Sequence, residues 1–214
     1  METDGAQGKC YGRYIMTESK AAGAETTEFL ARREALAGRL AEVVQREGVS
    51  VLSFRRAAEL LGTSGRMVVY YFRTRDDLVR LVLARVGAEA DGVFAGAFRK
   101  GMDEAEILRV WVRLAQDERH GGIMRLWTEI LSLGARGEAP YDEIAGAIVA
   151  KWTAWLSHIL DDPDPAAGRA EALLAMAEGL SLLDLVRPGL LGRAGEMLAK
   201  RFSQGPGCGR GPES

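Results

Sequence analysis

The stretch SFRRAAELLGTSGRMVVYYF, residues 53–72, has the pattern of two short helices joined by a tight turn. In its first half the apolar residues follow the i, i+3, i+4, i+7 spacing of one helix face: Phe54, Ala57, Ala58 and Leu61. Each half begins with a serine that suits an N-cap, Ser53 and Ser64. Gly62 tolerates the positive φ that a tight turn needs. These features predict helices over 54–61 and 65–72 in a helix-turn-helix arrangement.

The second half of this stretch has a competing interpretation. The run Val68–Phe72 has high β-propensity, so a strand is the alternative there. Its position between capped helical segments favours a helix, because Thr74 and Asp77 form a capping signature for a helix over about 75–98. Residues 49–52 are compatible with a short strand, but we expect a loop.

Helical spacing of apolar residues continues along the rest of the chain. No proline precedes Pro140, so proline forces no helix to break before that point. We predict further helices over about 27–47, 103–117, 122–135, 140–160, 165–186 and 189–203. No stretch has the sustained alternation of a strand, and the predicted fold class is therefore all-α.

The composition is that of an ordinary globular protein, with 47% hydrophobic and 27% charged residues among 214. It excludes wholesale disorder, collagen and coiled-coil rods, and no apolar run reaches the ~18–20 residues that cross a bilayer. Because no signal-peptide pattern is visible, we expect a cytoplasmic protein without a membrane partner. The two cysteines stand among glycines near the termini and suit neither a structural disulfide nor a metal site: Cys10 and Cys208.

Charge is distributed unevenly along the chain. Residues 29–85 contain eleven arginines and six acidic residues, a net charge of +5, whereas residues 86–214 have a net charge of −5. Within residues 51–75, five arginines face a single acid, Glu59. This asymmetry indicates that the N-terminal part meets a polyanion. The alternative is a solvated helical surface that is rich in arginine.

Enzyme motifs are incomplete in this sequence. The glycines at 62 and 65 do not form a nucleophile elbow, because Arg66 stands where the second glycine belongs. The glycines of residues 205–211 lack the preceding strand and following helix of a dinucleotide fingerprint. The two histidines, His120 and His158, have no metal-ligand spacing. We therefore expect neither an enzyme nor a bound metal or cofactor.

Residues 29–85 resemble the N-terminal DNA-binding domain of the TetR family of transcriptional regulators. Residues 53–64 are similar to that family's second helix and turn, residues 65–72 to its short third helix, and residues 74–78 to the start of its fourth. The resemblance covers about a quarter of the chain. It implies a homodimer in which each subunit joins a three-helix helix-turn-helix DNA-binding domain to a larger antiparallel helical domain for ligand binding and dimerisation.

The resemblance and the composition together divide the chain into four parts. We expect a disordered head over 1–26, a helix-turn-helix domain over 27–85, a ligand-binding and dimerisation domain over 86–203, and a flexible tail over 204–214. Met16 is a second candidate for the first residue of the protein.

The resemblance places the DNA contacts on and around the predicted third helix: Ser53, Arg55, Ser64, Gly65, Arg66, Met67, Val69, Tyr70, Tyr71 and Arg75. Arg66 stands where the family usually has a small residue, and its guanidinium suits guanine or a phosphate. Val69 replaces the usual tyrosine, whose hydroxyl Tyr70 would supply from a neighbouring angle. Arg75 replaces a phosphate-binding lysine. The two serines and the helix N-termini suit phosphate binding.

All four tryptophans lie C-terminal to this block. With neighbouring side chains they are the predicted lining of an apolar ligand pocket, and the alternative is an ordinary core: Leu108, Trp111, Met124, Trp127, Ile148, Trp152, Trp155 and His158. The last two predicted helices carry apolar stripes that suit a four-helix bundle across a two-fold axis, or packing within one subunit: Leu173, Leu174, Ala177, Leu180, Leu185, Leu190, Leu191, Ala194 and Leu198. In such a dimer the third helices would lie ~34–36 Å apart, or farther on a longer operator.

These expectations predict a sequence-specific DNA-binding regulator, a homodimer whose partners are a double-stranded DNA operator and a small, largely apolar ligand. As in most of the family, it would be a repressor that the ligand releases. One alternative is a helical small-molecule sensor or carrier that acts through protein contacts. Another is an activator, or a constitutive nucleoid-type binder without a ligand.

Overall fold

The computed structural model describes residues 7–160 and 168–204, with side chains for 26–117, 121–160 and 168–204. Within these residues every regular element is a helix: α1 (Gln7–Glu47), the 3-10 helix η1 (Val49–Val51), α2 (Phe54–Leu61), α3 (Gly65–Phe72), α4 (Arg75–Ala97), α5 (Glu104–Gln116), α6 (Glu118–Ala135), α7 (Tyr141–Leu160), α8 (Arg169–Val186) and α9 (Leu190–Ser203). The all-α prediction is confirmed.

Local sequence sets the ends of the short helices α2 and α3. The Ser53 hydroxyl accepts a hydrogen bond from the N–H of Arg56, and the Ser64 hydroxyl accepts one from the N–H of Met67. Gly62 ends α2 in the left-handed conformation, with φ of 66°. Two helices with these bounds were predicted, so the helical interpretation of residues 68–72 is confirmed over the strand.

The turn between α3 and α4 is a strained one. Arg73 has φ of 52° and ψ of −56°, and the N–H of Thr74 donates to the carbonyl of Phe72 across it. The Thr74 hydroxyl then accepts from the N–H of Asp77, which confirms the predicted cap of α4. This turn lets α4 begin at once, so that α3 is held against its first residues.

Buried apolar residues from α1 to α4 form one core that reaches into the C-terminal helices. Phe72 and Leu40 are among its largest wholly buried side chains, and Leu126 and Ile130 of α6 belong to the same cluster. α4 continues past residue 85 into the second part, where Phe94 and Phe98 join a second core with α5, α7 and α8. The proposed domain boundary at residue 85 therefore falls inside a continuous helix.

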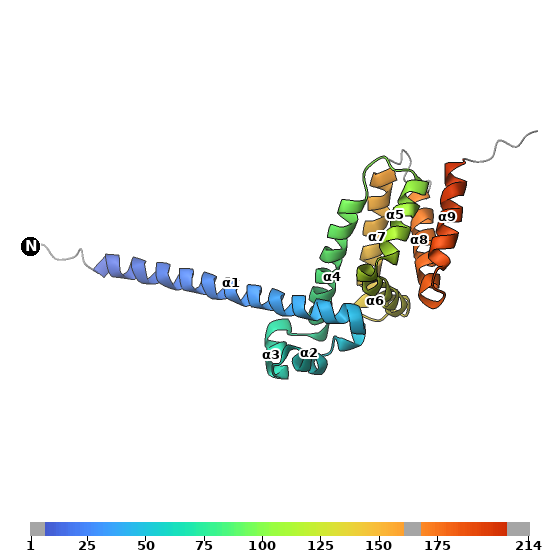
Figure 1. The fold of residues 1–214 in the computed structure, drawn as a ribbon. Helices are drawn as coiled ribbons and strands as arrows, with labels where there is room; N and C mark the ends of the chain where they lie inside the picture. The colour runs from blue at the N-terminus through green and yellow to red at the C-terminus, as the bar shows by residue number, and fades with distance from the viewer. Residues whose placement is uncertain (1–6, 161–167, 205–214) are drawn as a thin grey trace, which may run out of the picture.

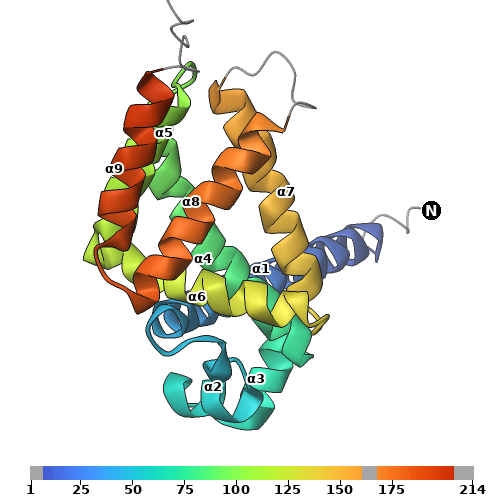
Figure 2. The same cartoon turned by 90° about the vertical axis from the view of Figure 1, so that its right-hand side faces the viewer.

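The C-terminal helices form a bundle above the N-terminal ones. α5 packs against α9, and α8 lies between α7 and α9, while α6 runs across the base of the bundle over α2 and η1 (Figure 2). α2 and α3 occupy the end of the molecule farthest from the tip of the bundle (Figure 1). Among the described residues, no helix is both long enough and apolar enough to cross a membrane.

Three predicted helix starts differ from the structure, those of α1, α6 and α8. α1 begins at Gln7 instead of near residue 27, so residues 7–26 are helical where a disordered head was predicted. These residues contain no proline that would interrupt a helix. The N-terminal part of α1 projects away from the body of the molecule (Figure 1). α6 begins at Glu118, four residues before the predicted start near residue 122, and passes through Gly121 and Gly122. Gly122 is needed for packing, since a Cβ there would lie 2.8 Å from the carbonyl oxygen of Gln45.

Smaller differences concern short segments and the ends of the chain. Residues 49–51 form a 3-10 helix, where we expected a loop. α8 begins at Arg169 instead of near residue 165, after Gly168 with φ of 73°. The predicted tail over 204–214 and the first six residues of the predicted head lie almost wholly outside the described residues.

Candidate nucleic-acid interface and ligand pocket

The helix α3 has one buried face and one exposed face. Val68 and Phe72 are 1% and 0% exposed, and they anchor the helix in the N-terminal core. The opposite face carries Arg66, Met67, Val69 and Tyr70, all exposed. These four predicted contact residues therefore lie together on the exposed face of α3, and Figure 2 shows this short helix at the end of the molecule.

The predicted phosphate-binding serines act as helix caps. Each hydroxyl oxygen accepts a backbone N–H of its own helix, at 3.3 Å in both α2 and α3. Each hydroxyl hydrogen remains available to a further acceptor. Gly65, the first residue of α3, is exposed, and a Cβ added to it would meet no atom within 4 Å. The N-terminus of α3 is thus open to an anion.

An aromatic cluster holds α3 against α1. Phe29 of α1 stacks on Tyr71 with 5.3 Å between ring centroids, and it meets the edge of Tyr70 at the same distance. Tyr71 is half-buried as a result, whereas Tyr70 is 58% exposed. Sequence analysis missed Phe29; the signal that could have found it is an aromatic residue in an otherwise polar stretch of α1.

The arginines of this region differ in how far they are neutralised. Arg56 donates to both Glu47 and Glu59, and these hydrogen bonds raise its pKa above the ordinary value. Arg55 has a 92% exposed side chain and makes one contact with Glu59, at 3.3 Å. Among residues with described side chains, neither Arg66 nor Arg73 has an ion-pair partner, so their charge is available to a ligand.

Arg75, the predicted phosphate contact, is joined to the C-terminal bundle. Its guanidinium donates to the hydroxyl of Tyr141 at 3.3 Å and lies 5.8 Å from the centre of that ring. Tyr141 is buried at the start of α7, and this burial raises the pKa of its hydroxyl, while Arg75 acts in the opposite direction. A phosphate at Arg75 would therefore compete with a contact between the two parts of the chain.

A cavity of about 100 Å³ lies between α4, α5, α6, α7 and α8. Five of the eight predicted pocket residues line it: Trp111, Met124, Trp127, Ile148 and Trp152. The other three predicted residues do not line it. Leu108 is buried against α9, Trp155 packs on Phe98 at 4.9 Å, and His158 is exposed. Trp155 lies about one turn beyond Trp152 on α7, where its ring packs beside Trp152 at 5.6 Å, so helical spacing alone did not show where the cavity ends along the helix.

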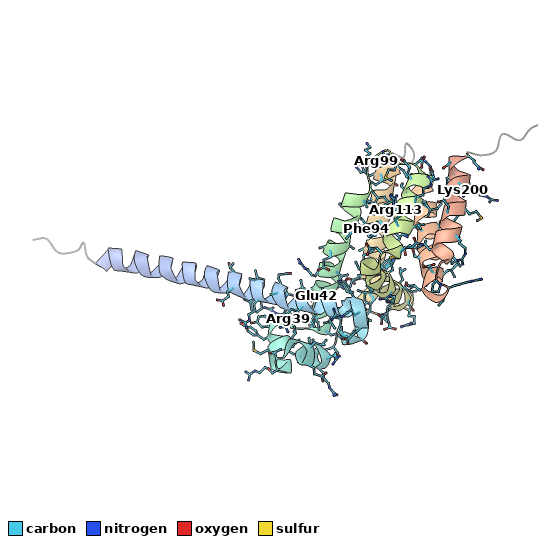
Figure 3. All side chains as sticks on the ribbon, in the orientation of Figure 1. Arg39, Glu42, Phe94, Arg99, Arg113 and Lys200 are labelled. Atoms are coloured by element: carbon cyan, nitrogen blue, oxygen red, sulfur yellow. The ribbon has the colours of Figure 1, made fainter. Side chains whose placement is uncertain are left out.

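The aromatic wall of the cavity is fixed by ring contacts and one hydrogen bond. Phe94, labelled on α4 in Figure 3, meets the edge of Trp152 with 4.3 Å between centroids and lies 5.7 Å from Trp111. The indole N–H of Trp111 donates to the hydroxyl of Ser181, which donates in turn to the carbonyl of Ala177. Phe94 was not predicted, because it lies near the end of a long helix whose earlier turns belong to the N-terminal core.

Three ionisable side chains line the cavity. Lys151 forms an ion pair with Asp91. Glu178 accepts a hydrogen bond from the indole of Trp127, and burial raises its pKa to about 7 against the smaller, opposite effect of that hydrogen bond. Glu178 was missed by sequence analysis, because an isolated glutamate on an amphipathic helix is usually exposed.

α6 connects this cavity to the segment just before α2. It lines the cavity through Ile123, Met124 and Trp127, and its Glu129 carboxylate accepts the N–H of Val49 in η1 at 2.9 Å. Gly48, with φ of 80°, passes so close to the same carboxylate that a Cβ there would lie 2.5 Å from its oxygen. A displacement of α6 would thus reach the residues that lead into α2.

Several predicted dimer-interface residues are used within the subunit. The side chains of Leu173, Leu174, Ala177 and Leu191 are buried in one chain, so these residues pack in the subunit's own core. Leu180 and Leu198 pack against Leu108, while Leu185 is exposed and Leu190 and Ala194 are partly exposed. Besides Leu185, the exposed large apolar residues of α8 and α9 were not among the predicted ones: Leu182, Leu183, Val186, Met197 and Phe202.

The described side chains contain no group of three histidine, cysteine, aspartate or glutamate residues that could hold a metal ion. The side chains of Cys10, Cys208 and His120 lie outside the described ones.

No family model matches this chain, and no curated protein matches its sequence. Among solved structures, the chain is similar to the crystal structure of a protein from Rhodococcus sp. assigned to the TetR family of transcriptional regulators. The two are 21% identical with a TM-score of 0.59, over 80% of this chain and 96% of the other. This likeness establishes the fold that the sequence resemblance implied.

Proposed function

We propose that this chain is a sequence-specific DNA-binding transcriptional regulator, a cytoplasmic homodimeric repressor that a small, largely apolar ligand releases from its operator. The exposed face of α3 is the observation that carries this proposal. Arg66 projects there without an ion-pair partner in the described chain, on a helix whose opposite face is anchored by Val68 and Phe72. A short helix presented in this way suits the major groove of DNA.

The contacts around α3 have the chemistry of a duplex interface. Arg66 suits a bidentate contact with guanine, and Arg55, Arg73 and the open N-terminus of α3 suit phosphates. Tyr70 would supply the phenol that Val69 lacks, since it lies on the exposed face beside it. Tyr71, held by Phe29, would mainly position the helix. The remaining predicted contacts are Ser53, Ser64, Gly65, Met67 and Arg75.

The proposed dimer uses the outer surfaces of α8 and α9. Val186 is 81% exposed, Leu182 and Leu183 are exposed about one turn earlier on α8, and Met197 is exposed on α9. Apolar area of this kind favours a self-complementary interface of helices across a two-fold axis. Val186→Glu is expected to give a monomer in light scattering, whereas Ala84→Glu on the exposed side of α4 leaves the mass unchanged.

The proposed release follows from the position of α6. A ligand that enlarges the cavity would push on α6, and its Glu129 contact would carry the movement to η1 and α2. Rotation of α2 and α3 would then change the distance between the two α3 helices of the dimer. Because the spacing of the grooves in a rigid duplex is fixed, the dimer would no longer fit its operator.

Binding to DNA is tested by selection of duplex sites followed by footprinting at several salt concentrations. A preferred site, with affinity that falls steeply as salt rises, is expected. Arg66→Ala should weaken that site by about tenfold to a hundredfold, with loss of preference at one base pair. Arg113→Ala, an exposed arginine on α5 (Figure 3), is the control and should change affinity less than about twofold. Absence of any preferred duplex would overturn the proposal.

A second function rests on the apolar part of the same face. Met67, Val69 and Tyr70 would also suit a protein partner of a helical sensor or carrier. This alternative predicts binding to a protein that changes little with salt, and no preferred duplex.

A further inference from the structure

The charges around the cavity between α4 and α8 do not cancel. Asp91 is paired with Lys151, the only basic side chain among those that line the cavity in the described structure. Glu178 has no ion-pair partner in the described chain, and its carboxylate accepts only from the neutral indole of Trp127. With Glu178 ionised, the lining therefore has an excess of one negative charge.

A second hollow continues from the same wall. It has a volume of about 410 Å³ and shares Trp127, Trp152 and Glu178 with the first cavity. Its lining adds a second carboxylate, Glu171, and includes no lysine or arginine. Glu178 thus stands on the wall between two hollows, and an anion in either one would meet an uncompensated carboxylate.

The remaining walls of the first cavity are rich in aromatic rings. Phe94, Trp111, Trp127 and Trp152 all line it, and Phe94, Trp111 and Trp152 hold one another at 4.3 to 5.7 Å between centroids. Aromatic faces attract cations through their negative quadrupole, most strongly where water is excluded. Aromatic rings beside a carboxylate that has no ion-pair partner are an arrangement that recognises an ammonium group.

We propose that the cavity between α4 and α8 binds a small organic cation, an amine or quaternary ammonium with an apolar body, through Glu178 and the rings of Phe94, Trp111, Trp127 and Trp152. This inference rests on the proposed function, in which the cavity is the ligand site. The apolar body lies against Leu83, Ile148 and their neighbours, and the positive charge lies beside Glu178. The second hollow accepts the longer substituents.

The proposal also determines how binding depends on pH. A cation binds the ionised form of Glu178, so its affinity rises as pH increases through the raised pKa of that carboxyl, about 7, and binding releases a proton. The other charged groups that face Glu178 are Asp91 and Lys151, which are paired, and Glu171 on the same helix. The lining contributed by α5 and α6 is apolar or aromatic among the described side chains.

Three probes of one shape and different charge test the proposal: choline, the neutral 3,3-dimethylbutan-1-ol and the anionic 3,3-dimethylbutanoate. Binding is followed by tryptophan fluorescence and by calorimetry in two buffers, which measures proton release. We expect choline to bind at least about tenfold more tightly than the alcohol at pH 8, and the anion to bind least. Equal affinity for choline and the alcohol, or no binding of choline, overturns the proposal.

Two variants assign the binding to Glu178. Glu178→Gln keeps the shape of the side chain and should lower choline affinity about tenfold or more, abolish proton release and leave the alcohol unchanged. Glu171→Gln, which alters the second hollow but not the lining of the first cavity, should leave choline affinity within about twofold. Trp152→Leu gives an independent readout, since it removes a ring face and should weaken choline more than the alcohol. Unchanged choline binding in Glu178→Gln overturns the assignment.

Operator binding without ligand, measured on the same proteins, separates this inference from the proposed function. If choline binds as expected but no duplex site exists, the cation site stands and the regulator proposal fails. If the duplex site exists but choline and the alcohol bind equally, the regulator stands and the cation site fails.

Discussion

The α2–α3 unit and the ligand cavity are built from sequence in opposite ways. Twenty consecutive residues, 53–72, contain all of α2 and α3, the two serines that cap their N-termini, and the glycine that ends α2. The cavity instead draws its lining from five helices, between Leu83 and Glu178. Hydrogen bonds within one turn of a helix fix the first region, whereas the packing of distant segments fixes the second. A mutation in the α2–α3 unit should therefore affect mainly its neighbours in sequence, whereas a mutation in the cavity should affect several helices.

The largest effect is expected where the local unit meets the core. Phe72→Ala should destabilise the folded chain by about 3–5 kcal/mol, because it removes a wholly buried ring. Chemical denaturation followed by circular dichroism measures this change. Tyr70→Ala, two residues earlier and 58% exposed, should cost less than about 1.5 kcal/mol. Equal losses would mean that the two faces of α3 do not differ in burial.

The cavity should make stability depend on pH through Glu178. Burial raises its pKa to about 7, so the folded chain holds this proton more tightly than the unfolded one. The free energy of unfolding should therefore fall as pH rises from about 4.5 to about 7, by up to about 3 kcal/mol, and change little above that. Denaturant titrations of Glu178→Gln, compared with the unmodified chain, isolate this contribution. If the free energy of unfolding of the variant changed with pH as it does in the unmodified chain, Glu178 would not be the source of the pH dependence.

The contact between α6 and α1 should be broken by a single methyl group. Gly122→Ala places a Cβ 2.8 Å from a backbone oxygen, and we expect a loss of about 1–3 kcal/mol. Its neighbour provides the control: a Cβ at Gly121 would meet only the end of the Arg125 side chain, at 3.5 Å, so Gly121→Ala should stabilise α6 by up to about 1 kcal/mol. Thermal unfolding of both variants measures the difference, and changes of the same sign would refute the close approach.

The smallest effect is expected at the cap of α3. Ser64→Ala removes the acceptor of the Met67 N–H and should cost about 1 kcal/mol. Hydrogen exchange of amides in the first turn of α3 should increase, whereas exchange in α8 should not. Uniform acceleration across the chain would mean that α3 does not open as a local unit.

The accuracy of the sequence predictions follows the same division. The bounds of α2 and α3 were predicted correctly because Ser53, Gly62 and Ser64 act on their immediate neighbours. Among the predicted dimer residues, Leu173 and Leu191 pack in the subunit's own core, which the sequence did not predict because α8 and α9 are apolar on more than one face and periodicity does not say which face meets that core. Phe29, Phe94 and Glu178 were missed because each acquires its role from a helix distant in sequence.

Sequence alone determined that the chain is helical, where the α2–α3 unit lies, and which end of the protein carries positive charge. These properties depend on residue spacing, capping and net charge, which are local or additive quantities. The tertiary structure decided that Arg66 is exposed without an ion-pair partner, that Arg75 contacts Tyr141, and that Glu178 lies among aromatic rings. Such properties arise only when helices pack, because burial and pairing depend on which side chains meet across the fold.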